Sequence, residues 1–65
     1  MQQNTFPRYL TPTEASEYLG LTTGTLANMR SLGTGPSFVR RGRIIRYAEA
    51  DLVAYLEAGR VQVSA

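Results

Sequence analysis

The sequence contains no cysteine and no histidine. Their absence excludes disulfide bridges, a thiol nucleophile, haem attachment and the zinc sites that depend on these residues. With 65 residues there is room for one small domain, and a core of that size supplies a net stability of about 3–5 kcal/mol. We therefore predict a fold stabilised by packing or by partners, with no metal ion and no cofactor.

Long apolar runs are also missing. A helix that spans a bilayer needs a run of roughly 18 apolar residues, and no stretch of the sequence approaches that length. The N-terminus, Met-Gln-Gln-Asn-Thr, lacks the basic and then apolar order of a signal peptide. These features predict a protein that works in the cytoplasm and has no membrane partner.

The carboxylates have no catalytic partners. All five lie at the ends or on the solvent-facing sides of expected helices, and there is no histidine, cysteine or phosphate-cradling glycine loop to pair with them. We predict that the protein is not an enzyme and has no catalytic residue among Glu14, Glu17, Glu49, Asp51 and Glu57.

Lysine is absent as well, so all seven basic residues are arginine. Arginine makes planar bidentate contacts to phosphate or guanine that an ammonium group cannot make, although a genome rich in GC would explain the bias equally well. The net charge is only +2, but Arg40, Arg41, Arg43 and Arg46 fall close together. Such a cluster predicts a surface that binds a polyanion, with a merely solvated hairpin as the alternative.

A capping box predicts the first helix. Thr11 is the expected N-cap, Pro12 the first helical residue, and Glu14 follows the cap at the capping-box spacing. Gly20 supplies the left-handed conformation that favours an end near Leu19. The expected apolar face of this helix consists of Ala15, Tyr18 and Leu19.

A second helix follows after a tight turn, and the pair is predicted to be a helix-turn-helix. Thr22 can cap this helix, Gly33 ends it, and Leu26, Met29 and Leu32 form its expected buried stripe. The opposite face carries small and polar side chains, with Arg30 at its flank. We call this face, which consists of Thr23, Gly24, Ala27, Asn28 and Ser31, the reading face.

Small residues would let the backbone of this helix approach the bases of a major groove. Asn28 could bond bidentately to adenine, and Arg30 could bond to guanine or phosphate. Gly24 costs about 1 kcal/mol relative to alanine inside a helix, and close approach to DNA would account for it. The alternative is an ordinary amphipathic helix with a polar outside. The predicted DNA-binding residues of this helix are Thr22, Thr23, Gly24, Thr25, Ala27, Asn28 and Arg30.

The next segment predicts a β-hairpin, which we call the wing. Two β-prone runs, 38–40 and 44–47, flank the turn Arg41-Gly42-Arg43. Alternation places Ile45 with the core and Ile44 on the more exposed face. An arginine-tipped wing suits a minor groove or its phosphates. The predicted DNA-binding residues of the wing are Arg40, Arg41, Gly42, Arg43 and Arg46.

A third helix is predicted from Glu49 to Ala58, with Ala48 as a poor cap and an inner face of Leu52, Tyr55 and Leu56. The expected fold is mainly α with a small β-hairpin, a winged helix-turn-helix domain. Residues 9–59 would form the domain. Residues 1–8 would be a flexible arm, and residues 60–65 a tail that is either disordered, which we favour, or a strand offered to a partner.

This order of elements resembles the small winged-helix DNA-binding domains of the MerR superfamily, and more closely their stand-alone excisionase (recombination directionality factor) and AlpA-like group. The resemblance covers residues 9–58. It rests on Leu-Thr-Pro-Thr-Glu-Ala-Ser-Glu-Tyr-Leu-Gly-Leu, the loop Gly-Thr-Gly-Pro, Arg-Gly-Arg-Ile-Ile-Arg-Tyr and Ala-Asp-Leu.

The resemblance implies that the second helix reads the major groove and that the wing reaches the minor groove. Similar proteins are phage or mobile-element excisionases, which bind neighbouring direct repeats beside an attachment site, bend the DNA and direct a tyrosine integrase towards excision. Others are small transcriptional regulators. The expected partners are double-stranded DNA, a tyrosine integrase and adjacent copies of the chain. The sequence lacks the effector region and long dimerisation helix of full MerR regulators, which favours the excisionase. A winged helix that binds only protein is the third alternative.

Overall fold

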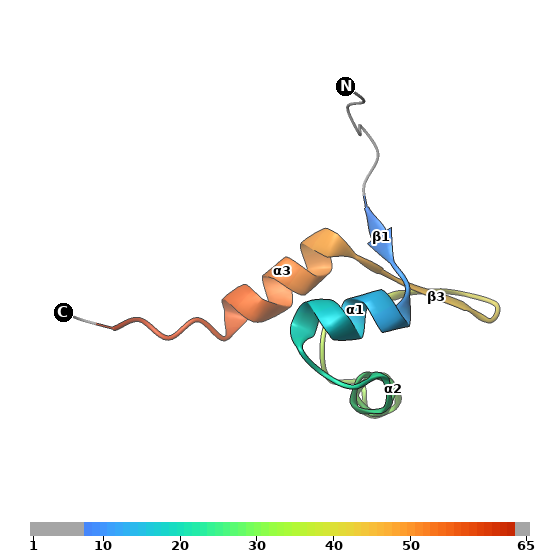
Figure 1. The fold of residues 1–65 in the computed structure, drawn as a ribbon, viewed down its shortest axis with the longest axis horizontal. Helices are drawn as coiled ribbons and strands as arrows, with labels where there is room; N and C mark the ends of the chain where they lie inside the picture. Colours follow the sequence, from blue (N-terminus) through green and yellow to red (C-terminus); the bar gives the residue numbers. More distant parts are fainter. Residues whose placement is uncertain (1–7, 64–65) are drawn as a thin grey trace, which may run out of the picture.

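The structure is a computed structural model that describes residues 8–63. The predicted arm, apart from Arg8, and the last two residues of the predicted tail lie outside the described residues. Figure 1 shows α1 at the centre of the fold, with α3 and the β2–β3 hairpin extending to opposite sides. Along the described chain the elements are β1 (Tyr9–Leu10), α1 (Pro12–Leu19), α2 (Thr23–Leu32), β2 (Val39–Arg41), β3 (Ile44–Ala48) and α3 (Glu49–Ala58).

The capping residues set the ends of the first two helices as predicted. The backbone N–H of Glu14 donates to Oγ1 of Thr11 (3.2 Å), and the backbone N–H of Thr11 donates to Oε1 of Glu14 (2.9 Å). Gly20 and Gly33 close α1 and α2 with φ angles of 74° and 73°. These are left-handed conformations that glycine adopts without steric cost.

The third helix begins at Glu49 without a side-chain cap, because Ala48 has no group that can accept a hydrogen bond. The backbone carbonyl of Arg8 accepts a hydrogen bond from the N–H of Glu49 at 2.9 Å instead. The residue before β1 therefore satisfies the first of the unpaired backbone amides at the start of α3.

The hairpin is part of a three-stranded antiparallel sheet with the order β1-β3-β2. β3 pairs with β2 through Val39–Arg46, Arg40–Ile45 and Arg41–Ile44, and with β1 through Tyr9–Ala48 and Leu10–Tyr47. The sequence did not predict β1, because two residues are too few to show an alternating pattern.

The core lies where α1, α2, α3 and the inner face of the sheet meet. It contains one side chain from each of β1, α1, α2, β3 and α3 and none from β2, with Leu19, Met29, Phe38 and Ile45 packed against it. Ile45 packs against the core and Ile44 is exposed, which confirms the predicted alternation. Fully or almost fully buried apolar residues are Leu10, Ala15, Leu26, Tyr47 and Leu52.

Three residues predicted to face inward are exposed. Leu32 is 67% exposed, and Tyr18 and Leu56 are 42% and 48% exposed. Leu32 is the last residue of α2, and six residues from Leu26 rotate it by about 120° around the helix, away from the buried side. Leu56 lies near the end of α3, which extends beyond α1 (Figure 1). The predicted stripes are therefore correct at Ala15, Leu19, Leu26, Met29 and Leu52 and wrong at these three positions.

The chain has the architecture of a winged helix-turn-helix domain, as the sequence predicts. α1 packs against both α2 and α3, which holds α2 at the surface, with the hairpin beside the helices. Within residues 8–63, no helix combines the length and the apolar character needed to cross a membrane.

Candidate nucleic-acid interface

The reading face of α2 is exposed along its length. Leu26 anchors the opposite side of the helix in the core and has no exposed surface. Because α2 packs against the rest of the domain through the side that carries Leu26, its opposite side is accessible to a ligand with a groove as wide as the helix. The exposed residues include all five members of the reading face together with Thr22 and Thr25.

Hydroxyl groups organise the start of α2. Oγ1 of Thr22 accepts a hydrogen bond from the backbone N–H of Thr25 (3.0 Å), and the Thr22 hydroxyl donates to Oγ1 of Thr25 (2.9 Å). The Thr22 hydroxyl proton is thus engaged within the protein, whereas the Thr25 hydroxyl can still donate outward. The start of α2 also presents backbone N–H groups and the positive end of the helix dipole, which favour an anion.

Gly24 lies within this first turn, and its φ angle is not positive. A Cβ added there would meet only Oγ1 of Thr22, at 3.9 Å. Neither the backbone conformation nor a close neighbour in the protein therefore requires glycine at this position.

Arg30 links α2 to the sheet. Its Nη1 donates a hydrogen bond to the hydroxyl of Tyr47 at 2.9 Å. Tyr47 is fully buried, and its ring lies 5.9 Å from that of Phe38. The half-buried Arg30 thus fixes the orientation of α2 relative to the wing. No pattern in the sequence signals this pairing, because the two residues are 17 positions apart. A guanidinium has five N–H donors, so one bond to Tyr47 leaves others that can contact a ligand.

The tip of the wing is a two-residue turn formed by Gly42 and Arg43, because Arg41 pairs with Ile44. Gly42 has a φ angle of 61°, and no other residue type in the described chain has a positive φ. A positive φ at the first central position and not at the second is the pattern of a type II′ turn, which favours glycine there.

The sheet register divides the four wing arginines between two faces. Arg40 pairs with Ile45 on the inner face, and its guanidinium carbon lies 5.8 Å from the centre of the Phe38 ring. Arg41 and Arg46 stand on the outer face, where Nη1 of Arg46 donates to the backbone carbonyl of Ile45 at 2.7 Å. Arg43 occupies the tip. The arginines that are close in sequence therefore surround the wing rather than forming a single row.

Positive and negative charges are separated in space. The carboxylates belong to α1 and α3, and within the described chain none of the wing arginines forms an ion pair with a carboxylate. Arg60 pairs with Glu57 outside the wing. The charge of the wing is therefore not neutralised locally and can attract a polyanion.

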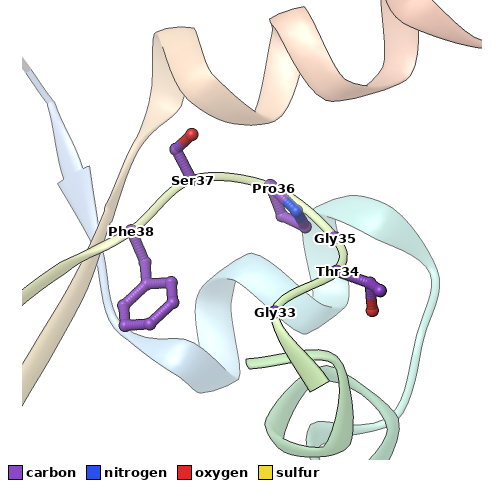
Figure 2. A pocket seen from close by; sticks show the side chains of 6 residues that line it. All are labelled: Gly33, Thr34, Gly35, Pro36, Ser37 and Phe38. Atoms are coloured by element: carbon purple, nitrogen blue, oxygen red, sulfur yellow. The ribbon is translucent and has the colours of Figure 1, made fainter. Parts of the chain in front are cut away.

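A shallow, open hollow of about 300 Å³ lies along the loop that connects α2 to β2 (Figure 2). Gly35 is required in this loop, because its φ is +81° and an added Cβ would lie 3.0 Å from Cβ of Met29. Figure 2 shows the Ser37 hydroxyl and the Phe38 ring on opposite sides of the loop. The hollow has no titratable side chain among its lining residues, which are Gly33, Thr34, Gly35, Pro36, Ser37 and Phe38.

The predicted sites thus come together as two neighbouring surfaces, the reading face and the wing. Sequence reasoning missed one exposed side chain beside them. Leu32 follows Asn28 by four residues, so it lies on the same side of α2. The position of Leu32 directly before Gly33, which ends the helix, is the feature of the sequence that indicates its exposure. The last turn of a helix often has no other element packed against it.

Comparison with known proteins agrees with this geometry. A family model described as a helix-turn-helix domain matches residues 9–60, which include every helix and strand of the described chain. Among proteins with a curated description, none matches.

Proposed function

Because the chain belongs to the helix-turn-helix domain family, which includes small DNA-binding proteins of the AlpA and excisionase kind, we propose that it recognises a specific sequence in double-stranded DNA and acts as a phage or mobile-element excisionase. Membership of the family indicates DNA binding. The sequence specificity, the excision reaction and the residue roles below are parts of the proposal.

One observation supports the proposal most strongly. α2 exposes a face of small and polar side chains, and it is linked through Arg30 and Tyr47 to a wing whose arginines form no ion pair with a carboxylate in the described residues. A narrow helix surface beside a basic hairpin matches a major groove and the minor groove next to it.

In this proposal Asn28 reads a base, because its amide can bond bidentately to adenine. Arg30 contacts guanine or phosphate with the donors that Tyr47 does not use. Thr23 and Thr25 donate their hydroxyl protons to phosphate, whereas Thr22, whose proton is engaged by Thr25, holds the first turn of α2 in place. Gly24 and Ala27 permit the close approach of the helix.

The wing supplies contacts that do not depend on sequence. Arg41, Gly42 and Arg43 reach the minor groove, and Arg40 and Arg46 strengthen the attraction from positions further back. If four or five phosphates are neutralised, the logarithm of the binding constant should fall with the logarithm of the salt concentration with a slope of about −4.

As an excisionase, the protein would bind adjacent direct repeats, each covering about one helical turn. Neighbouring copies would bend the DNA between them and favour assembly of a tyrosine integrase into the excisive complex. A single copy has a small footprint, so binding to an isolated site should be weak.

Two other functions share the same fold. An AlpA-like transcriptional regulator would use the same DNA contacts at a promoter. A winged helix that binds only protein would use neither the reading face nor the wing arginines for DNA.

Selection of bound DNA from a random pool at moderate salt distinguishes these functions. Tandem direct repeats near one-turn spacing, bound cooperatively, are the result that the excisionase predicts. An inverted repeat would contradict the excisionase and favour the regulator. Absence of any enriched sequence would contradict specific DNA recognition altogether.

A further inference from the structure

Two arginines from different elements are attached to one pair of aromatic rings. Nη1 of Arg30 donates to the hydroxyl of Tyr47 at 2.9 Å, and the guanidinium carbon of Arg40 lies 5.8 Å from the centre of the Phe38 ring. The two rings are 5.9 Å apart and inclined by 47°. We call these four residues the arginine-aromatic cluster. It connects an arginine of α2 with an arginine of β2.

The aromatic pair is a fixed support for the two arginines. Tyr47 has no exposed surface, and Phe38 packs against the core. Arg40 pairs with Ile45, which precedes Tyr47 by two residues and lies on the same face of β3. Two residues of a strand span roughly 6.5–7 Å. Arg40 is therefore one such step closer to the tip of the wing than Tyr47.

The hydrogen-bonding needs of the protein do not account for the two guanidinium groups. A buried tyrosine hydroxyl needs a partner, which a neutral side chain or a water molecule could supply. Arg30 has five N–H donors, and its bond to Tyr47 uses one of them. The stacking of Arg40 on Phe38 uses the flat face of the guanidinium and none of its N–H donors. Both arginines therefore keep donors for a ligand.

The charges of the two arginines are not neutralised by the protein. In residues 8–63 the ion pair found joins Arg60 to Glu57, and the carboxylates belong to α1 and α3. Arg40 is exposed and Arg30 is half-buried, so an anion from outside can contact both. A planar guanidinium with outward donors matches the oxygens of a phosphate group.

The arginine-aromatic cluster lies between the reading face and the tip of the wing. Arg30 follows Ala27 by three residues, which places it about 60° around α2 from the reading face, on the side that meets the sheet. A helix in a major groove and a hairpin tip in the adjacent minor groove are separated by one sugar-phosphate strand. This strand has to cross the junction between α2 and the wing, where Arg30 and Arg40 lie.

We propose that the aromatic pair holds Arg30 and Arg40 against phosphates of the strand that separates the two grooves. Tyr47 and Phe38 are then positioning residues, which touch no DNA and act through the arginines. This inference rests on the proposed function above, and it decides between the two ligands that were open for Arg30 in favour of phosphate. The cluster sets the register of α2 in the groove, and Asn28 reads the base.

Positioning before binding is the contribution of the aromatic pair. A hydrogen bond to a charged acceptor strengthens binding by about 10- to 150-fold. Fixing a flexible side chain at the moment of binding weakens an interface by about 2- to 12-fold. Because Tyr47 already fixes Arg30 in the free protein, the bond between Arg30 and a phosphate avoids this loss.

Duplexes in which one phosphate at a time is replaced by a neutral methylphosphonate test the proposal. The ratio of Kd on a modified duplex to Kd on the unmodified duplex gives the loss at that phosphate. Both values come from the same protein, so a smaller folded fraction cancels from the ratio. The wild type should lose about 10- to 150-fold at phosphates between the base pair read by Asn28 and the minor groove bound by the wing.

The variants identify which side chain uses each phosphate. In Arg30→Ala the loss at one of these phosphates should disappear. In Tyr47→Phe it should shrink by about 2- to 12-fold, with every other loss unchanged. Phe38→Leu should do the same at the neighbouring phosphate held by Arg40. Tyr55→Phe is the matched control, because it removes the hydroxyl of a half-buried tyrosine on α3 and should change no loss. If Tyr47→Phe does not fold, Arg30→Lys replaces it, since lysine keeps the charge without the planar fork.

Each other outcome has a definite meaning. A full loss at every phosphate in Tyr47→Phe would overturn the positioning role. A changed base preference in Arg30→Ala would overturn the assignment to phosphate, because it would show that Arg30 reads guanine. A wild type that binds DNA without selecting a sequence would refute the proposed function alone. On such an arbitrary duplex Arg30→Ala should still reduce the salt slope by about 1, and an unchanged slope would overturn the inference. A wild type that binds no DNA would refute both.

Discussion

At Gly24, protein stability and DNA binding are expected to favour different residues. The residue has helical geometry without a positive φ, and an added Cβ would meet only Oγ1 of Thr22 at 3.9 Å. Alanine therefore fits the folded helix and restricts the unfolded chain. We expect Gly24→Ala to raise the free energy of unfolding by about 0.4–1 kcal/mol, which corresponds to a rise in Tm of about 2–8 °C for a domain of this size.

The same methyl group would lie on the reading face, next to the backbone N–H groups of the first turn of α2. If this turn approaches a phosphate, the methyl group pushes the backbone away and weakens a hydrogen bond to a charged acceptor. Loss of one such bond costs about 1.5–3 kcal/mol, so Kd should increase by about 10- to 150-fold. The variant should thus be more stable and bind DNA less tightly.

Thermal unfolding and fluorescence anisotropy on a selected duplex measure the two effects. Ala27→Gly is the matched control, since it removes a methyl group from the reading face and destabilises the helix by about 0.5–1 kcal/mol without adding any atom that could block DNA. If Gly24→Ala is stabilised but keeps its full DNA affinity, the close approach of the helix backbone is refuted. If Gly24→Ala is less stable than the wild type, residue 24 does not have the helical conformation and the free space for a Cβ that the structure shows.

Further substitutions test the loop, the core and the DNA contacts. Gly35→Ala should destabilise the domain by about 2–3 kcal/mol in urea unfolding, against about 1–2 kcal/mol for Gly33→Ala. Both glycines have a positive φ, but only at Gly35 would an added Cβ also meet a close neighbour. Equal losses of stability would show that this close contact has no effect. Tyr47→Phe should cost about 1–2 kcal/mol, because it removes the acceptor of a half-buried guanidinium, and unchanged urea unfolding would show that the bond contributes nothing. Asn28→Ala should relax discrimination at one base pair by about 1–3 kcal/mol in competition binding, and an unchanged preferred sequence would refute its reading role. Arg43→Ala should weaken binding to most sequences alike and reduce the salt slope by about 1; a loss confined to one sequence would show that it reads bases.

The helix ends were predictable because their signals are local. Thr11 and Glu14 are three residues apart, and the hydrogen bonds that they exchange involve only that short segment. The C-terminal ends of α1 and α2 are predictable for the same reason, because the positive φ that ends each helix involves a single glycine. The hairpin was predictable for a related reason, because β2, its turn and β3 are contiguous in the chain.

Features that depend on distant segments were not predictable. β1 forms by pairing with the second edge of β3. A segment of two residues is too short to show a pattern that predicts this pairing. The position of Arg30 on α2 predicts a DNA contact, while its bond to Tyr47 depends on how the helix meets the sheet. The spacing of Leu32 fits a helical stripe and predicts burial, but burial needs an opposing element, and none within residues 8–63 covers this end of the helix.

The composition of the reading face limits how much sequence one copy can recognise. Asn28 is its only member with two donor hydrogens and a carbonyl acceptor, Thr23 and Ser31 each have one hydroxyl, and Gly24 and Ala27 have no polar side-chain group. A good bidentate pair contributes about 1–3 kcal/mol of discrimination, or roughly 5- to 150-fold. Specific complexes are typically 10³- to 10⁷-fold tighter than non-specific ones, and the wing arginines strengthen both kinds alike. If α2 reads DNA as proposed and Arg30 contacts phosphate, one copy therefore discriminates too little on its own, and recognition of a unique site requires several copies that each read a short sequence side by side.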